Sequence, residues 1–189
     1  MIYAIRHGQT DWNKEGIIQG GGSNCPLNEE GLKQAKILAE KLKNFHITKI
    51  YSSDLLRAKQ TTEEINKILK VEVVYSPLLR ETNYGEVEGK KSAEIDKVER
   101  YVQICEAVDA EDNDAHFPCG ESRNMVVKRF KNFLQSIKDK DNILISTHGG
   151  ILRSFFCLCG GVDRKIPNCG GISFSLNTQC IPNNIVFFE

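Results

Sequence analysis

The chain has 189 residues, of which 40% are hydrophobic and 26% are charged, with 25 basic and 25 acidic side chains. This composition is typical of a folded globular protein and excludes disordered and fibrous architectures. The balanced charge excludes the overall basic field on which nonspecific nucleic-acid binding depends, so any attraction for an anion must be local.

Buried strands are predicted where short, β-branched apolar runs are bounded by polar or turn residues. Four such runs cover residues 2–5, 47–51, 71–75 and 143–146. Two later runs, at 172–176 and 185–188, are separated by too few residues for a helical crossover. We therefore expect an antiparallel pairing near the C-terminal end.

Helices are predicted between these strands from apolar residues at helical spacing. The first follows Asn28, which is expected to cap it, and has acidic residues in its first turn. Others are expected from about Asp54 to Leu69, from about Ser122 to Ile137, and from Gly149 to a stop at Gly160-Gly161. Strands alternating with helices predict an α/β fold, a three-layer α/β/α sandwich with a mostly parallel central sheet, formed by a single domain of residues 1–189.

Residues 90–119 interrupt this alternation, because they show no clear core periodicity. The span 96–115 carries seven acidic and two basic side chains, a local charge of −5. One interpretation is a solvated helical excursion, and the other is a small helical cap that discriminates among substrates. The two interpretations are compatible.

The seven cysteines are odd in number and show no repeated metal-site spacing, Cys157 and Cys159 forming a lone C-x-C pair. We expect free thiols in a reducing compartment, the cytoplasm, and no bound metal. The sequence also shows no signal-peptide pattern and no apolar run long enough to span a membrane, so no membrane partner is expected.

Two histidines follow predicted strands and precede glycine: Arg6-His7-Gly8 and Thr147-His148-Gly149-Gly150. Ligands of open α/β sheets bind beyond the carboxyl ends of strands, and the glycines let the backbone approach closely. The N-terminus of the helix after His148 is expected to attract an anion. His46 and His116 lack this context and are interpreted as a helix-end residue and a loop residue.

Two further junctions add an arginine and a carboxylate. Arg57 falls in the first turn of the helix that follows a strand, where a guanidinium and nearby N–H groups favour a dianion. Glu81 follows another strand and can act as a general acid beside phosphate. Spacing alone leaves Glu86 and Glu88 open as alternatives to Glu81 in this role.

The ordered set of motifs resembles the histidine phosphatase superfamily, the phosphoglycerate-mutase-like group, over residues 2 to about 155. The residues that carry the resemblance are, in chain order, Arg6-His7-Gly8-Gln9-Thr10-Asp11-Trp12-Asn13, Gln19-Gly20, Pro26-Leu27-Asn28-Glu29-Glu30-Gly31, Ser52 to Thr61, Leu79-Arg80-Glu81, Tyr84-Gly85, Glu88-Gly89, Gly120-Glu121-Ser122 and His148-Gly149-Gly150. The pattern around Glu81 resembles the α-ribazole phosphatase and broad-specificity phosphatase branch.

The resemblance implies a role for each matching residue. His7 would be the nucleophile that becomes phosphohistidine, and Glu81 would protonate the leaving alcohol and then activate water. The phosphate-binding residues would be Arg6, Arg57 and a cationic His148, assisted by Asn13 and the Gly149 N–H, with Gln19 and Gly20 in a loop at the pocket rim. It also implies a small phosphate ester as substrate, inorganic phosphate as product, and no cofactor.

The chain departs from the mutases of the group in two places. Thr82-Asn83 follow Glu81 where mutases carry a basic residue, and an acidic stretch stands where they have a longer insertion. These departures favour hydrolysis of a phosphomonoester over a cofactor-dependent phosphoglycerate mutase, the alternative. A third hypothesis is a noncatalytic phosphate-binding module, which the presence of all four main polar residues disfavours. The natural substrate and the oligomeric state are left open.

Overall fold

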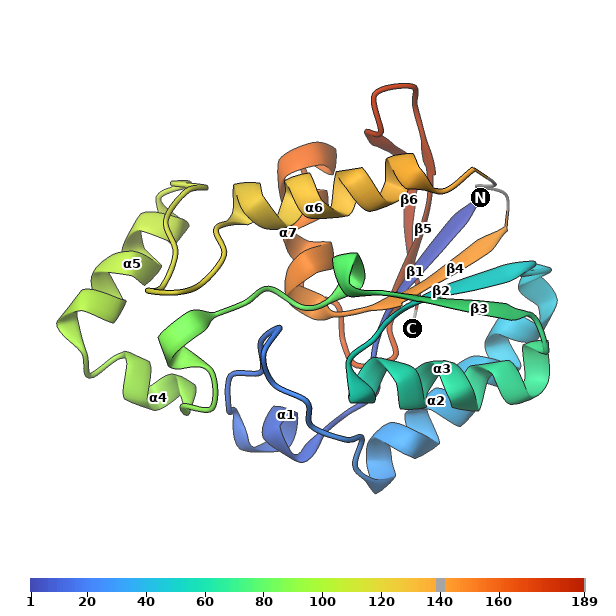
Figure 1. Ribbon diagram of the computed structural model, residues 1–189, viewed down its shortest axis with the longest axis horizontal. Coiled ribbons are helices and arrows are strands. Elements are labelled where there is room, and N and C mark those ends of the chain that lie inside the picture. Colours follow the sequence, from blue (N-terminus) through green and yellow to red (C-terminus); the bar gives the residue numbers. More distant parts are fainter. Residues whose placement is uncertain (139–141, 189) are drawn as a thin grey trace.

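The computed structural model describes residues 1–138 and 142–188, so residues 139–141 and 189 of the predicted domain lie outside the described part. Its centre is a six-stranded sheet of order β3-β2-β4-β1-β5-β6 (Figure 1). The first four strands in this order run parallel, β5 is antiparallel to β1, and β6 is antiparallel to β5. The strands are β1 (Ile2–Arg6), β2 (Lys49–Ser53), β3 (Glu72–Ser76), β4 (Ile143–Thr147), β5 (Gly171–Leu176) and β6 (Pro182–Phe188).

Helices cover both faces of the sheet, which confirms the predicted three layers. On one face, α2 (Glu29–Leu42) and α3 (Leu56–Leu69) pack against each other, and on the other lie α6 (Arg123–Ser136) and α7 (Gly149–Gly160) (Figure 1). Each face has its own apolar core, one including Leu38 and Ile65, the other including Phe130 and Phe155. Burial of these apolar side chains stabilises the sheet. The carboxyl ends of its parallel strands carry the polar residues of the predicted site.

The helix ends follow the predicted capping chemistry. Asn28 accepts a hydrogen bond from the Gly31 N–H at 2.8 Å, and Ser122 accepts one from Met125. Gly161 ends α7 in the left-handed conformation, at φ 65°. His46 also has a positive φ, of 51°, at the end of the short 3₁₀ helix Lys43–Phe45 that follows α2.

Four predicted boundaries are wrong by two or three residues. β2 begins at Lys49 rather than at residue 47. β2 extends through Ser52 and Ser53, which are fully buried and whose backbone pairs with β3, although serine suggested a strand end. Accordingly α3 begins at Leu56 rather than Asp54, and β6 begins at Pro182 rather than Ile185. The five-residue helix α1 (Asp11–Glu15) was not predicted, since it buries no apolar residue and depends on a Thr10 capping box.

The excursion at 90–119 is helical, as predicted. It contains α4 (Ser92–Ile95) and α5 (Glu99–Asp109), which lie beyond the edge of the sandwich (Figure 1). Two 3₁₀ turns, Pro77–Leu79 and Gly85–Val87, lead into it from β3. A small separate core containing Val87, Ile95 and Tyr101 holds the excursion together, and most of its acidic side chains are exposed. No helix in the described part is both long and apolar enough to span a membrane.

Candidate active site

The pairing of β1 with β4 brings the two histidines together. Arg6 lies opposite Thr147 in the parallel register, so the next residue of each strand is a histidine at the same sheet edge. The ring centroids of His7 and His148 are 5.1 Å apart, and both rings are buried.

The backbone fixes the tautomer of His7. Its Nδ1 lies 2.7 Å from the Gly8 carbonyl oxygen, and because a carbonyl oxygen only accepts, Nδ1 must carry the proton. Nε2 therefore holds the lone pair. The loop around the ring is fixed as well, since the Gly8 N–H donates to the Thr61 hydroxyl and the Asn168 amide donates to the His7 carbonyl.

Arg57 is fully buried behind the histidines. Its Nη1 donates to the Ser23 carbonyl at 2.7 Å and its Nη2 to the Gly20 carbonyl at 3.1 Å. The loop at 19–23 thus holds the guanidinium through its own backbone. Gly20, which the resemblance placed among the phosphate- and substrate-binding residues, contributes this carbonyl and does not line the cavity of about 490 Å³ that adjoins His7.

Three buried nitrogens at the site have no hydrogen-bond partner among the described residues. They are Arg6 Nε, Arg57 Nε and His148 Nδ1. Other atoms of these groups are engaged, since Arg6 Nη1 donates to the Ile166 carbonyl and His148 Nε2 lies 2.8 Å from the Ser53 hydroxyl. Unsatisfied buried donors are costly, and a tetrahedral anion is a ligand that satisfies several at once.

The Glu81 carboxylate occupies part of the N-terminus of α7. Its oxygens accept from the N–H groups of Gly150 at 2.9 Å, Ile151 at 3.0 Å and Thr82 at 2.8 Å. The sequence predicted that this helix end attracts an anion, and among the described contacts that anion is a side chain of the protein. Gly149 remains in the cavity wall, where a Cβ atom would lie 3.2 Å from Arg6 Nε.

The structure separates the three glutamates that spacing left open. Glu81 lines the cavity, whereas Glu86 forms an exposed ion pair with Arg100. Glu88 braces the loop at 19–23, where it accepts from the Ser23 hydroxyl at 2.8 Å, and it also accepts from the Tyr84 N–H. Of the three, only Glu81 is placed to exchange a proton with a ligand in the cavity.

This cavity of about 490 Å³ adjoins part of the predicted site, since Arg57 and His148 are not among the residues that line it. Six of the predicted site residues line it: Arg6, His7, Asn13, Gln19, Glu81 and Gly149. The Asn13 amide oxygen accepts from Thr10 and Asn168, so its NH₂ group is the part able to donate to a ligand. Gln19 is held by the Thr10 hydroxyl. The far wall comes from the excursion and from α7 with the loop after it, and includes Ser92, Ile95, Asp96, Cys105, Phe117, Arg153, Lys165 and Ile166.

Comparison with known proteins agrees with this geometry. The sequence profile of the histidine phosphatase superfamily (branch 1) matches residues 2–176. The chain belongs to this superfamily. It is a phosphatase of that superfamily, which removes the noncatalytic module from consideration.

Named relatives include both phosphatases and proteins named after mutases. Phosphoglycerate mutase-like protein 4 of Arabidopsis thaliana is 36% identical, covering 94% of this chain and 76% of the relative. A metal-independent phosphoserine phosphatase of the same plant is 37% identical over 82% of this chain and 66% of that relative. A mycobacterial glucosyl-3-phosphoglycerate phosphatase, solved with VO₃, has a TM-score of 0.82, with 25% identity over 98% of this chain and 96% of that one. This chain covers 56% or less of the length of three other curated relatives.

Sequence reasoning missed several residues that hold or line the site. Thr61 and Asn168 fix the loop around His7, and Ser53 contacts His148. Arg153 and Lys165 bring positive charge to the cavity wall. Ser53 and Thr61 lie within a motif but carry no chemistry of their own. Lys165 and Asn168 lie in the loop between α7 and β5, and Arg153 lies in α7; none of the three has a sequence signal, because only tertiary packing brings them to the site.

Burial and the neighbouring guanidiniums disfavour protonation of both histidines. Burial lowers the pKa of His7 well below its ordinary value, and Arg57 and Arg6 lower it further. Burial lowers the pKa of His148 in the same way, followed by Arg57 and His7. Without an anion, protonation of His148 is therefore disfavoured, because three positive groups would share one water-poor space, and a cationic His148 stays a prediction for the phosphate-bound site.

These shifts predict that the phosphatase loses stability in mild acid. The unfolded chain binds protons on both imidazoles near pH 6.5, while the folded chain resists them, so stability is fully present above that pH and lost below it. In phosphate-free buffer the free energy of unfolding should fall by on the order of 1 kcal/mol per pH unit below about pH 6.5. Denaturant titrations of wild type and His148→Gln measure this.

The His148→Gln variant should show a shallower decline than wild type, because one of the two buried imidazoles is gone. The matched control is His46→Asn, which removes an exposed imidazole from a left-handed position that asparagine tolerates, and should keep the full decline. Equal slopes for wild type and His148→Gln would contradict the assignment.

No group of three or more potential metal-ligating side chains occurs in the described part of the chain. The described cysteines form no disulfide bonds. That the chain works without a metal or other cofactor stays a prediction.

Proposed function

We propose that the protein hydrolyses a small phosphate monoester through a phosphohistidine formed on His7. Two features together carry the proposal. His7 has a free lone pair on Nε2, and three buried nitrogens of the site, on Arg6, Arg57 and His148, have no partner among the described residues. The three nitrogens suit phosphoryl oxygens, while the lone pair suits attack on phosphorus.

The reaction proceeds in two balanced steps. In the first, His7 Nε2 attacks phosphorus, the bond from phosphorus to the ester oxygen breaks, and the proton of Glu81 passes to that oxygen. In the second, the Glu81 carboxylate takes a proton from water, the resulting hydroxide attacks phosphorus, and the phosphorus–nitrogen bond breaks. Inorganic phosphate leaves, and His7 returns as the neutral imidazole whose Nδ1–H still donates to the Gly8 carbonyl.

Charge stabilisation comes from groups that are already in place. Arg57 is held by two backbone carbonyls and Arg6 by one, so neither has to reorganise as charge spreads over the equatorial oxygens. A bound dianion also reverses the local balance of charge and favours protonation of His148. His148 then donates to the phosphoryl group.

The excursion at 90–119 is the part that selects the leaving group. Its residues Ile95, Asp96 and Phe117 line the same cavity as His7 and mix apolar and acidic character. We propose that residues 1–189 work as one catalytic domain in which this cap contacts the alcohol portion of the substrate.

Changing Glu81 to glutamine tests the proton donor of the mechanism. In an aryl phosphate with an acidic phenol the phenolate leaves without protonation. In an alkyl phosphate the leaving alcohol requires a proton on its oxygen. Glu81→Gln should therefore lower kcat/KM for the alkyl ester by about 10²–10⁴-fold and for the aryl ester by far less. The measurement compares kcat/KM for 4-nitrophenyl phosphate and ethyl phosphate.

Glu86→Gln is the matched control, because that carboxylate pairs with Arg100 outside the cavity, and it should leave both values unchanged. Equal losses on the two esters in Glu81→Gln would mean that Glu81 is not the acid.

A second candidate function, phosphoglycerate mutase, is favoured by the names of two relatives and by Lys165 in the cavity wall, where Arg153 is already paired with Asp163. A coupled assay of 2- and 3-phosphoglycerate interconversion separates the two. Interconversion faster than release of inorganic phosphate would favour the mutase.

A further inference from the structure

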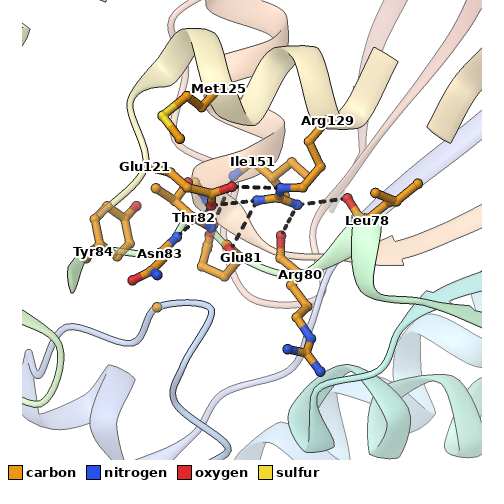
Figure 2. A network of polar contacts seen from close by, with 12 residues as sticks. Leu78, Arg80, Glu81, Thr82, Asn83, Tyr84, Glu121, Met125, Arg129 and Ile151 are labelled. Atoms are coloured by element: carbon orange, nitrogen blue, oxygen red, sulfur yellow. Dashed lines mark hydrogen bonds and ion pairs between the residues drawn. The ribbon is translucent and has the colours of Figure 1, made fainter. Parts of the chain in front are cut away.

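An ion pair behind the active site connects α6 to the segment that carries Glu81. Arg129 and Glu121 form a two-pronged pair in which Nε donates to Oε1 at 3.0 Å and Nη2 to Oε2 at 2.9 Å (Figure 2). Both side chains are mostly buried, with 16% and 20% of their surface exposed. Neither residue lines the large cavity, so neither contacts a ligand there.

Arg129 also holds the near side of the Glu81 segment by its backbone. Its Nη1 donates to the carbonyls of Leu78 and Arg80, each at 2.8 Å, and its Nη2 reaches the Glu81 carbonyl at 3.4 Å. One planar guanidinium thus engages three carbonyls and one carboxylate. A lysine ammonium lacks this fork of fixed donors.

Glu121 holds the far side of the same segment. Its Oε2 accepts from the Asn83 N–H at 2.9 Å, and its own N–H donates to the Asn83 carbonyl at 2.7 Å. The ion pair therefore grips the chain on both sides of Glu81 (Figure 2).

The segment needs such a grip because residues 80–84 belong to no helix or strand. Their backbone carbonyls and N–H groups have no ladder or helix to join, and each buried one must find a partner elsewhere. α6 is a rigid base for this purpose, since Phe130 and Phe133 beside Arg129 are buried in the core. The Glu81 side chain then points away from the pair, to the N-terminus of α7.

We propose that the Arg129–Glu121 pair is a positioning device for the general acid Glu81. The proposal rests on the function proposed above. Glu121, part of the Gly120-Glu121-Ser122 motif, and Arg129 share this role. Both position Glu81 through the backbone of residues 78–83. Loss of the pair lets the carboxylate drift from the ester oxygen and leaves His7, Arg6 and Arg57 in place.

The test is the leaving-group dependence of Arg129→Met and Glu121→Gln. Each should lower kcat/KM for ethyl phosphate by about 10–100-fold and for 4-nitrophenyl phosphate by less than about 3-fold. Added to Glu81→Gln, neither change should produce a further selective loss, because the acid that it positions is already gone. Glu121→Gln keeps the size of the side chain, so it tests the proposal even if Arg129→Met folds poorly.

Arg80→Ala is the matched control. Its side chain points away from Arg129, toward an exposed two-pronged pair with Asp54, while its backbone belongs to the gripped segment (Figure 2). This variant should keep the wild-type ratio of the two substrates.

Equal losses on both esters, or no loss, in the Arg129 and Glu121 variants would overturn the positioning role. If Glu81→Gln is selective and these variants are not, the pair alone is wrong and the proposed function stands. If Glu81→Gln is itself unselective, the acid assignment fails and the positioning proposal fails with it. If His7→Ala retains activity, the proposed function fails directly.

Discussion

Replacing His7 by alanine should lower kcat for 4-nitrophenyl phosphate by at least about 10⁴-fold, because the reaction loses its nucleophile and keeps only binding and charge stabilisation. The loss should be equally complete for an alkyl ester. Steady-state release of inorganic phosphate measures it. Wild type assayed after dialysis against a chelator should keep its full rate, since the mechanism uses no metal.

The control for this variant is His116→Ala, which removes an exposed imidazole that does not line the cavity beside His7 and should leave the rate unchanged. Residual hydrolysis by His7→Ala within about 10-fold of wild type would mean that water attacks phosphorus directly. Wild-type turnover that vanishes with the chelator would contradict the metal-free mechanism.

The second large effect is expected for Arg57→Lys. Lysine keeps the charge but cannot donate to the carbonyls of Gly20 and Ser23 while presenting a third N–H to the phosphoryl group. The charge that develops in the transition state loses a fixed donor, so kcat/KM should fall by about 10²–10³-fold on both aryl and alkyl esters. Kinetics on the two esters, with a circular-dichroism melt to establish folding, measure the effect.

Arg100→Lys is the control, because it makes the same chemical change in an exposed pair with Glu86. It should keep the wild-type rate. A folded Arg57→Lys variant with near-normal kinetics would show that Arg57 serves only to hold the loop at 19–23.

The sequence predicts the fold and the placement of the histidines because both depend on short-range signals. β1 and β4 end directly before His7 and His148, and glycines follow both histidines. Asn28 caps α2 as its side chain suggests. In such places the local pattern and the tertiary structure require the same thing.

The remaining features depend on contacts between distant parts of the chain. Nothing near Glu81 indicates that its carboxylate will accept from N–H groups 70 residues later, in α7. Likewise, Arg129 is one of several basic residues in an amphipathic helix, and only the path of residues 78–83 beside α6 reveals its role. The predicted end of β2 is wrong for a related reason. Ser52 is buried because β3 and β4 lie on either side of β2, and the local sequence does not indicate this.

Trapping the intermediate tests the central claim most directly. The enzyme is mixed with 4-nitrophenyl phosphate, quenched within its turnover time in alkali, where a phosphoramidate survives, and digested for mass spectrometry. The account predicts one phosphoryl group on the peptide that contains His7, labile to acid and lacking in His7→Ala. Turnover with no phosphoryl group on His7, or with the group on His148 or another residue, would contradict it.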